Sequence, residues 1–270
     1  MIIQQEKAAI LYKLHQGPRL LVLPNCWDVA SALVIARAGA QAIATSSAGI
    51  AYVLGYPDGQ QIFRAEMLDM VRRVAAAVAV PVTADVEAGY GDAAETARQV
   101  IAAGAVGINL EDADENGRLF SLESQLERIR AARAAGNAAG VALVINARTD
   151  AFATPGFSNE VRAAEAVRRA NAYLEAGAGC AFVPFINDAT VIAQLVKQIR
   201  GPLNILAGPL SPPLADLERM GVRRVSLGSA VARAAYGRAQ QVAEEFLGSA
   251  TLKSLDGAIP YAEMQSLFSK

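Results

Sequence analysis

A phrase that recurs four times constrains this chain more than any other feature: an alanine-rich stretch ends at a glycine and a short apolar run follows. The four copies are AGAQAIATS (38–46), AGAVGINLE (103–111), AGAGCAFVP (176–184) and MGVRRVSLG (220–228). Their glycines, Gly39, Gly104, Gly177 and Gly221, are predicted to take the left-handed conformation that ends a helix without a steric cost from Cβ. The apolar run after each glycine predicts a buried strand.

Four further apolar runs, at 20–23, 82–85, 141–147 and 203–206, bring the number of predicted strands to eight. The intervening segments have helical periodicity, notably at 65–79, 93–103, 121–135, 160–176 and 189–199. Strands that alternate with helices pair in parallel through right-handed crossovers, and eight such units predict an α/β fold of the (β/α)₈ TIM-barrel type. An open doubly wound sheet is the alternative, but no GxGxxG motif follows the first strand.

No linker rich in Ser, Pro or charge divides the sequence, so we expect one domain. Residues 1–249 are predicted to form the barrel, and 250–270 a terminal helical segment without a further strand. That segment packs either on its own barrel or on a neighbouring subunit.

The composition excludes several classes of function. Hydrophobic residues make up 53% of the chain, and 25 Lys and Arg against 26 Asp and Glu give a net charge of −1. Such a balance favours neither a nucleic acid nor an anionic membrane as partner. No apolar run approaches the roughly 18 residues of a membrane span. The two cysteines, Cys26 and Cys180, lack CxxC spacing and His15 is the single histidine, which excludes multi-His metal sites and leaves the cytoplasm as the expected compartment.

Acidic residues cluster just after the predicted strands, where the active sites of such barrels lie. Asp85, Glu87 and Glu111 would bring three carboxylates from neighbouring strands to one point. Their mutual repulsion calls for a cation, and Mg²⁺ fits best because it takes one or two carboxylates directly and keeps several waters. The alternative for any one such residue is an N-cap or a turn.

Other polar residues follow the strands as well. Arg148 is placed to bind a substrate carboxylate, or else only pairs with Glu111 or Asp150. Hydroxyl and N–H groups of the Ser46, Ser47 and Gly49 loop would bind an anionic oxygen. Tyr90, between two glycines, is either a proton donor or a packing residue at the barrel mouth.

The sequence resembles the isocitrate lyase and phosphoenolpyruvate mutase superfamily over residues 20–229. The resemblance rests on five phrases in the family's order: LPNCWDVASALVIARAGAQAIATSSAGIA, LGYPDG, TADVEAGYGD, GAVGINLEDA and VINARTDAF. It implies a (β/α)₈ barrel, Mg²⁺ or Mn²⁺ at the mouth, and a small 2-oxo acid or its enolate as ligand. It also implies a homodimer or homotetramer in which terminal helices are swapped between subunits.

The resemblance also implies roles for individual residues. Asp85 matches the direct metal ligand, and metal-bound water is held by the residues that match Asp58, Glu87 and Glu111. The carboxylate and carbonyl end of the substrate is bound by the matches of Trp27, Ser46, Ser47, Ala48, Asp85 and Arg148. The predicted catalytic residues are Asp58, Arg148 and Tyr90.

The sequence departs from the family where the lyases carry a KKCGH loop, whose cysteine acts as acid or base. Residues 111–125 read EDADENGRLFSLESQ, without cysteine, lysine or histidine. The mutases carry a lysine and an asparagine in a gating loop at this place, where this sequence offers only Asn116 and Arg118. Phe185 stands where the lyases carry a carboxylate.

The intact half of the site predicts a Mg²⁺-dependent carbon–carbon lyase or decarboxylase that acts on a small 2-oxo mono- or dicarboxylic acid. A Lewis-acid metal that stabilises an enolate suffices for such a reaction without a strong protein acid. Two alternatives stay open: a phosphonopyruvate-type enzyme of P–C bonds, and a non-catalytic protein that binds a 2-oxo acid.

Overall fold

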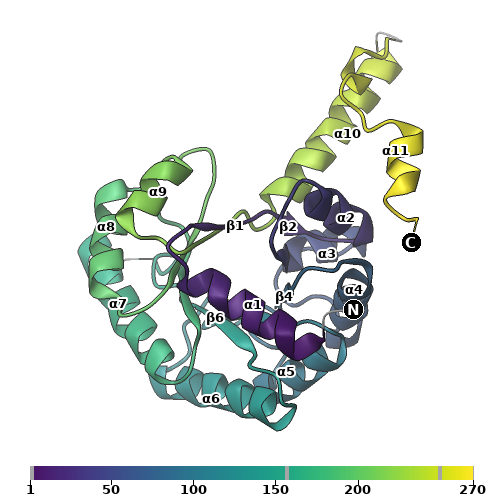
Figure 1. The fold of residues 1–270 in the computed structure, drawn as a ribbon. Helices are drawn as coiled ribbons and strands as arrows, with labels where there is room; N and C mark the ends of the chain where they lie inside the picture. Colours follow the sequence, from purple (N-terminus) through teal and green to yellow (C-terminus); the bar gives the residue numbers. More distant parts are fainter. Residues whose placement is uncertain (1–2, 156–157, 249–250, 270) are drawn as a thin grey trace.

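The computed structural model describes residues 3–155, 158–248 and 251–269 and shows parallel strands in a nearly closed barrel with helices around it (Figure 1). The strands are β1 (Leu21–Leu23), β2 (Asn25–Cys26), β3 (Ile43–Thr45), β4 (Val82–Asp85), β5 (Gly107–Glu111), β6 (Val144–Arg148), β7 (Cys180–Val183), β8 (Leu203–Leu206) and β9 (Arg224–Ser226). The predicted TIM barrel is thereby confirmed.

Helices connect the strands and extend to both ends of the chain. They are α1 (Gln4–Gln16), α2 (Val29–Arg37), α3 (Ser47–Val53), α4 (Arg64–Ala77), α5 (Ala93–Ala102), α6 (Leu122–Ala138), α7 (Asn159–Glu175), α8 (Ala189–Gln198), α9 (Leu214–Met220), α10 (Ala230–Gly248), the 3₁₀ turn η1 (Lys253–Leu255) and α11 (Tyr261–Ser266).

The count of eight strands needs one correction, because the first predicted strand is divided in two. β1 pairs with β9, whereas β2 pairs with β3, so the two short segments together close the barrel. Pro24 lies between them and has no N–H to donate to a ladder, which explains the division.

The helix-ending glycines have the predicted left-handed backbone. The φ angles are 98° at Gly39, 94° at Gly104, 108° at Gly177 and 100° at Gly221. Each glycine turns the chain from the end of a helix into the next buried strand, so the repeated phrase sets the repeated unit of the barrel.

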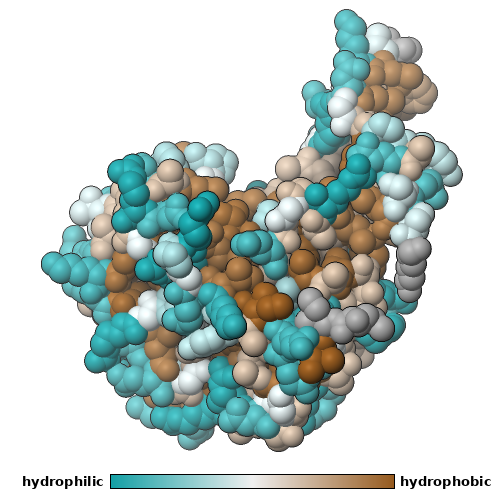
Figure 2. Space-filling view, in the orientation of Figure 1, coloured by the Kyte–Doolittle hydropathy of each residue, from teal (hydrophilic) through white to brown (hydrophobic). Residues whose placement is uncertain are grey.

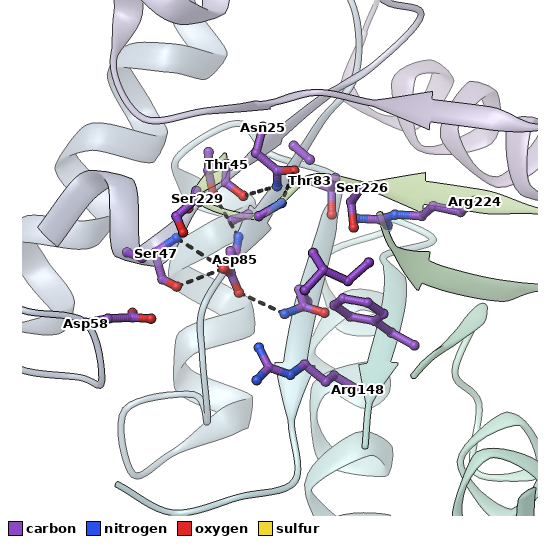
Figure 3. A pocket seen from close by; sticks show the side chains of 18 of the residues that line it. Asn25, Thr45, Ser47, Asp58, Thr83, Asp85, Arg148, Arg224, Ser226 and Ser229 are labelled. Atoms are coloured by element: carbon purple, nitrogen blue, oxygen red, sulfur yellow. Dashed lines mark hydrogen bonds between the residues drawn. The ribbon is translucent and has the colours of Figure 1, made fainter. Parts of the chain in front are cut away.

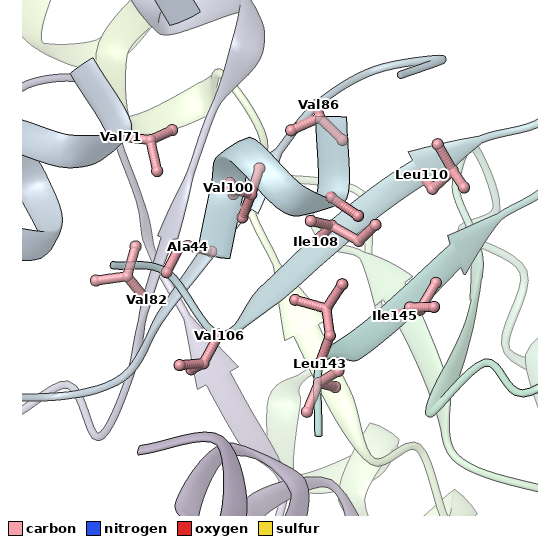
Figure 4. Close-up of a cluster of buried hydrophobic side chains, with 14 of the residues drawn as sticks. Ala44, Val71, Val82, Val86, Val100, Val106, Ile108, Leu110, Leu143 and Ile145 are labelled. Carbon is pink, nitrogen blue, oxygen red and sulfur yellow. The ribbon is translucent and has the colours of Figure 1, made fainter. Parts of the chain in front are cut away.

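The two faces of the strands differ sharply in polarity. Ile108, Leu110 and Ile145 point outward into a hydrophobic cluster beneath the helices (Figure 4). Their neighbours Asn109 and Asn146 point inward, where Asn146 Nδ2 donates to Asn109 Oδ1 at 3.1 Å. Because side chains alternate along a strand, the outer face holds the barrel against its helices while the inner face is free to carry polar groups.

The amino end of the barrel is covered by α1. Gln4 donates from Nε2 to the carbonyls of Ile101, in the last turn of α5, and of Ala105, just before β5, at 2.7 and 3.0 Å. The side chain of Leu11 is fully buried, and a Cβ on Gly107 would lie only 2.8 Å from it. With this end covered, a ligand enters from the carboxyl ends of the strands.

The C-terminal part projects from the barrel as an arm formed by α10, η1 and α11 (Figure 1). The expected boundary at 249–250 lies outside the described residues. The expected single terminal helix is instead a short turn and a six-residue helix. Arg37 and Glu263 form an ion pair of 2.8 Å that ties α11 to α2. No helix in the described part of the chain is long and apolar enough to cross a membrane.

Candidate active site at the mouth of the barrel

A polar cavity of about 160 Å³ opens at the carboxyl ends of the strands (Figure 3). Drug-sized sites measure roughly 300–1,000 Å³, so this one suits a ligand of a few heavy atoms. Six of the predicted site residues line it: Ser46, Ser47, Ala48, Asp58, Asp85 and Arg148. Trp27, Glu87, Tyr90 and Glu111 do not belong to the lining.

Asp85, at the end of β4, is held in place by neutral hydrogen-bond donors. Its Oδ2 accepts from Ser47 N at 3.1 Å and Ser47 Oγ at 2.8 Å, and its Oδ1 accepts from Asn109 Nδ2 at 2.8 Å. No Lys or Arg in the described residues forms an ion pair with it. The carboxylate is thus fixed in the cavity without an ion-pair partner in the described part of the chain, although Arg148 and Arg224 act on it from a distance.

Asp58 lies across the cavity from β4, on the loop between α3 and α4 (Figure 3). Burial and the negative charge of Asp85 raise the pKa of Asp58 above its ordinary value. Two carboxyl groups within one cavity favour a bound cation or a shared proton.

Arg148, at the end of β6, satisfies both interpretations offered by the sequence. It pairs with Glu111 at 2.5 Å and with both oxygens of Asp150 at 2.7 and 3.0 Å, and its guanidinium also lines the cavity. Although burial alone lowers its pKa, Glu111 and Asp150 hold the pKa of Arg148 above its usual range. Three of its N–H groups are used, and a guanidinium has five, so two remain for a ligand.

Two aromatic rings flank this guanidinium. Its Cζ atom lies 5.9 Å from the ring centroid of Phe182 and 5.5 Å from that of Phe185, distances typical of cation–π contacts. Phe185 is half exposed and has a φ of 65°, which is unusual for a residue with a side chain. The rings restrict Arg148 to one orientation at the rim.

Glu87 and Tyr90 point away from the cavity and toward each other. Both have left-handed backbones, with φ of 50° and 51°. Tyr90 donates its hydroxyl to Glu87 Oε1 at 3.0 Å, and the other oxygen of Glu87 accepts from Gln60 N at 2.5 Å. Burial, followed by the charge of Asp85, raises the pKa of Glu87 to about 7.

Glu111 faces Arg148 rather than the lining. Burial raises the pKa of Glu111 well above its ordinary value, and Arg148 opposes that shift. The charges of Asp85, Asp150 and Glu87 add to it.

The loop after β3 is shaped by close packing. Ser46 caps α3, since its Oγ accepts from Gly49 N at 3.2 Å. A Cβ on Gly49 would lie 2.6 Å from the Cβ of Trp27, so only glycine fits there. Trp27 itself lies beside Tyr236 of α10, with 6.4 Å between ring centroids. In this structure Trp27 therefore supports the loop and the arm.

A divalent cation fits this donor set with Asp85 as direct ligand and water for the remaining positions. No group of three His, Cys, Asp or Glu side chains lies at metal-binding spacing within 3–155, 158–248 and 251–269, so Asp85, Glu87 and Glu111 do not form a three-carboxylate cage. Mg²⁺ needs no such cage, because it is commonly bound through one or two carboxylates and several waters. Negative charge is in surplus around the cavity. Asp58 and Asp85 line it and Glu87, Glu111 and Asp150 lie near it, whereas the only guanidinium groups among the described residues of the lining are those of Arg148 and Arg224.

Several lining residues lie within strands rather than after them and were not among the predicted site residues. They are Thr83, Asn109, Phe182, Arg224 and Ser226. Period-two alternation supplies the signal, because each of them stands two positions from another inward-facing residue.

The phosphoenolpyruvate phosphomutase family matches residues 11–247, which is most of the chain. The chain belongs to this family. It is 32% identical over 253 residues to an uncharacterized protein of Mycobacterium tuberculosis (strain ATCC 25618 / H37Rv), covering 93% of each chain. It is 30% identical over 211 residues to 2-methylisocitrate lyase of Bacillus subtilis (strain 168), covering 74% of this chain and 67% of the lyase.

Solved structures agree with this assignment. A protein of Burkholderia cenocepacia J2315 described as a candidate lyase or mutase superposes with a TM-score of 0.90 at 35% identity, covering 99% of this chain and 97% of that one. Oxaloacetate acetylhydrolase with its product oxalate superposes with a TM-score of 0.86 at 25% identity, covering 97% and 93%. The predicted superfamily and the predicted class of enzyme are confirmed.

Proposed function

We propose that the protein is a divalent-metal-dependent carbon–carbon lyase that cleaves a small 2-oxo dicarboxylic acid, by decarboxylation or retro-aldol cleavage. One observation carries the proposal: Asp85, with no cationic partner, shares a small cavity with Asp58 and with the two free N–H groups of Arg148. Mg²⁺ or Mn²⁺, held by Asp85 and through water by Asp58, would supply Lewis-acid stabilisation of negative charge on the substrate oxygen.

The residues of the chain bind and orient the substrate. Arg148 donates its free N–H groups to the substrate carboxylate next to the carbonyl, and the Ser46, Ser47 and Ala48 loop supplies further polar contacts. Phe182 and Phe185 keep the guanidinium in place and exclude water from one side. In a decarboxylation the bond from C3 to the departing carboxylate breaks, its electron pair moves toward the carbonyl oxygen, and a proton is then added at C3.

The substrate class is supported by relatives of the chain. Oxaloacetate decarboxylase of Rhodopseudomonas palustris (strain BisB18) is 28% identical over 227 residues, covering 80% of this chain and 73% of that protein. The missing acid/base cysteine favours a reaction that needs no strong protein acid, and decarboxylation meets this condition.

Steady-state assays test the proposal directly. We expect oxaloacetate or a related 2-oxo acid to be consumed in the presence of Mg²⁺ or Mn²⁺ and spared in the presence of EDTA. No metal-dependent turnover across such a panel rejects the proposal. Phosphonopyruvate followed by ³¹P NMR reveals P–C bond chemistry instead, and a ligand-dependent rise in melting temperature without product reveals a binding protein.

We also propose that the arm mediates assembly of a homodimer or homotetramer, with terminal helices swapped between subunits. Ala232 is the single buried residue described in the nineteen-residue α10. Apolar side chains lie exposed along the arm, including Phe246, Leu247, Leu252 and Tyr261, and hydrophobic colour covers much of it (Figure 2). Truncation after Ser229 is expected to reduce the mass measured by light scattering to that of a monomer; an unchanged mass contradicts the role of the arm.

A cytoplasmic location is part of the same proposal. Cys26 and Cys180 are both buried free thiols, which suits a reducing compartment.

A further inference from the structure

Arg224 is a buried cation deep in the cavity. On β9, Val225 points outward into a hydrophobic cluster, while Arg224 and Ser226 line the cavity. Arg224 precedes Ser226 and Thr83 precedes Asp85, so these two residues lie deeper than the rim along their strands. Figure 3 shows the guanidinium of Arg224 pointing toward the space in front of Asp85.

Arg224 has no ion-pair partner among the described residues, and the charge of Asp85 acts on it only from across the cavity. Arg224 is 3% exposed, and no acidic side chain among 3–155, 158–248 and 251–269 forms an ion pair with it. Burial lowers the pKa of its guanidinium. Burying a charge without an ion pair costs free energy, and an apolar side chain in its place avoids that cost. A buried arginine at such a position is therefore expected to bind an anion.

Contacts within the protein do not explain the charge. Arg224 Nη1 lies 3.4 Å from Nε2 of His15, while Nδ1 of His15 lies 2.8 Å from Leu11 O. The contact is long, and burial keeps the imidazole ring of His15 neutral. A neutral donor in place of Arg224 could make the same contact, so His15 does not explain why this residue is charged. Arg224 Nε has no hydrogen-bond partner at all.

A second unpartnered group lies on the same lining. Thr83 Oγ1 is buried without a hydrogen-bond partner. These two atoms are shielded from solvent in the structure, but both residues line the cavity, and a guanidinium beside a hydroxyl offers a pair of donors to an oxygen anion.

We propose that Arg224 and Thr83 bind the second carboxylate of the substrate and thereby select dicarboxylic over monocarboxylic 2-oxo acids. This inference rests on the proposed function, which places the first carboxylate at Arg148. Arg148 and Arg224 line the same cavity of about 160 Å³, so one small ligand can meet both side chains. A carboxylate suits the planar fork of a guanidinium better than a spherical anion does.

Calorimetric titration in the presence of Mg²⁺ tests the inference with two probes, pyruvate and 3,3-difluorooxaloacetate, which share a 2-oxo acid end and differ in the second carboxylate. We expect Arg224→Met to weaken binding of the diacid by about 10–100-fold, the range for a lost charge-assisted hydrogen bond. Pyruvate affinity should change by less than about threefold, because the contacts at Arg148 and Ser47 are untouched. Arg224→Lys should retain part of the preference.

Arg223→Met is the matched control. Arg223 immediately precedes β9, lies outside the cavity lining and donates to Pro18 O at 3.1 Å. This substitution should leave both affinities unchanged. The melting temperature of ligand-free Arg224→Met should equal or exceed that of the wild type, which separates loss of binding from loss of folding.

The outcomes distinguish the two proposals. If the wild type binds pyruvate and Arg224→Met keeps its affinity for the diacid, the inference is wrong and the proposed function stands. Equal losses for both probes reduce Arg224 to a structural role and also overturn the inference. If the wild type binds neither probe, the proposed function falls and the inference falls with it.

Discussion

Two aspartates at the mouth of the barrel, the half-buried Asp85 and the buried Asp112, show how similar positions in a sequence acquire different roles. Asp112 is fully buried and accepts hydrogen bonds from Tyr173 OH at 2.6 Å, Asp150 N at 2.8 Å and Arg169 Nη1 at 3.2 Å. Asp85 accepts only from neutral donors and borders the cavity.

The difference lies in where the counter-charge comes from. The protein itself supplies a cation to Asp112, so that site is closed and complete. Asp85 forms no ion pair with any described residue, so its carboxylate is left to bind a cation that enters from solution. An acidic residue after a barrel strand is therefore a candidate for function only when the fold does not neutralise it.

The largest effect is expected for Asp85→Asn. Asparagine keeps the size of the side chain and an oxygen acceptor but removes the charge, so metal-dependent turnover should fall 10³-fold or more, equivalent to about 4 kcal/mol of transition-state stabilisation. Measurement of kcat/KM against Mg²⁺ concentration, with circular dichroism melts in parallel, checks this. Full activity in this variant would remove Asp85 from the active site.

The same substitution at Asp112 should lower stability and leave turnover nearly unchanged. Asp112→Asn removes the charge opposite Arg169 and should lower the free energy of unfolding by roughly 3–4 kcal/mol, the scale for breaking a buried ion pair. Its Oδ1 still accepts from Asp150 N, so kcat per folded molecule should stay within about threefold of wild type. Urea denaturation measures the free energy of unfolding, and kinetics normalised to folded protein measure kcat. A loss of kcat without a loss of stability would contradict a purely structural role for Asp112.

Much of the fold followed from the sequence because its signals are local. Gly39, Gly104, Gly177 and Gly221 mark helix ends through a backbone conformation that other residues rarely adopt. The apolar runs after them mark the strands, whose outward-facing residues pack in the core beneath the helices. The split at Pro24 was also open to prediction, since a proline inside a strand removes a ladder donor.

The candidate site could be predicted only in part from such local signals. Residues after the strands gave Asp85, Ser47 and Arg148, whereas Thr83 and Arg224 lie inside strands whose interior was expected to be apolar packing. Glu87 and Tyr90 turn away from the cavity because their backbones are left-handed, a conformation that residue type alone does not reveal. Tertiary context decided these positions.

A third buried titratable group extends the comparison to a base at the covered end of the barrel. Burial, and then the positive charge of Arg224, lower the pKa of His15 to about 4 from 6.5. The unfolded chain thus binds more protons between these two values, and stability falls as pH drops from about 6.5 to about 4. The loss at this residue should approach 3 kcal/mol.

Urea denaturation at several pH values in that window, on the wild type and on His15→Gln, measures this contribution. Glutamine retains an acceptor for Arg224 but does not titrate, so the variant should show a shallower decline. Parallel curves for the two proteins would mean that His15 is protonated without cost in the folded state.

The smallest effect is expected for Tyr90→Phe, which tests whether a residue at the mouth but outside the cavity takes part in the chemistry. Tyr90 donates its hydroxyl to Glu87, and its side chain does not line the cavity. A general acid usually contributes about 10²–10⁴-fold to a rate, whereas loss of one hydrogen bond to a neighbouring carboxylate should cost turnover less than about tenfold. A loss above 100-fold with an unchanged melting temperature would establish Tyr90 as the proton donor predicted from the sequence. It would also show that a residue outside the cavity lining, and not Asp85 alone, takes part in the chemistry at this mouth.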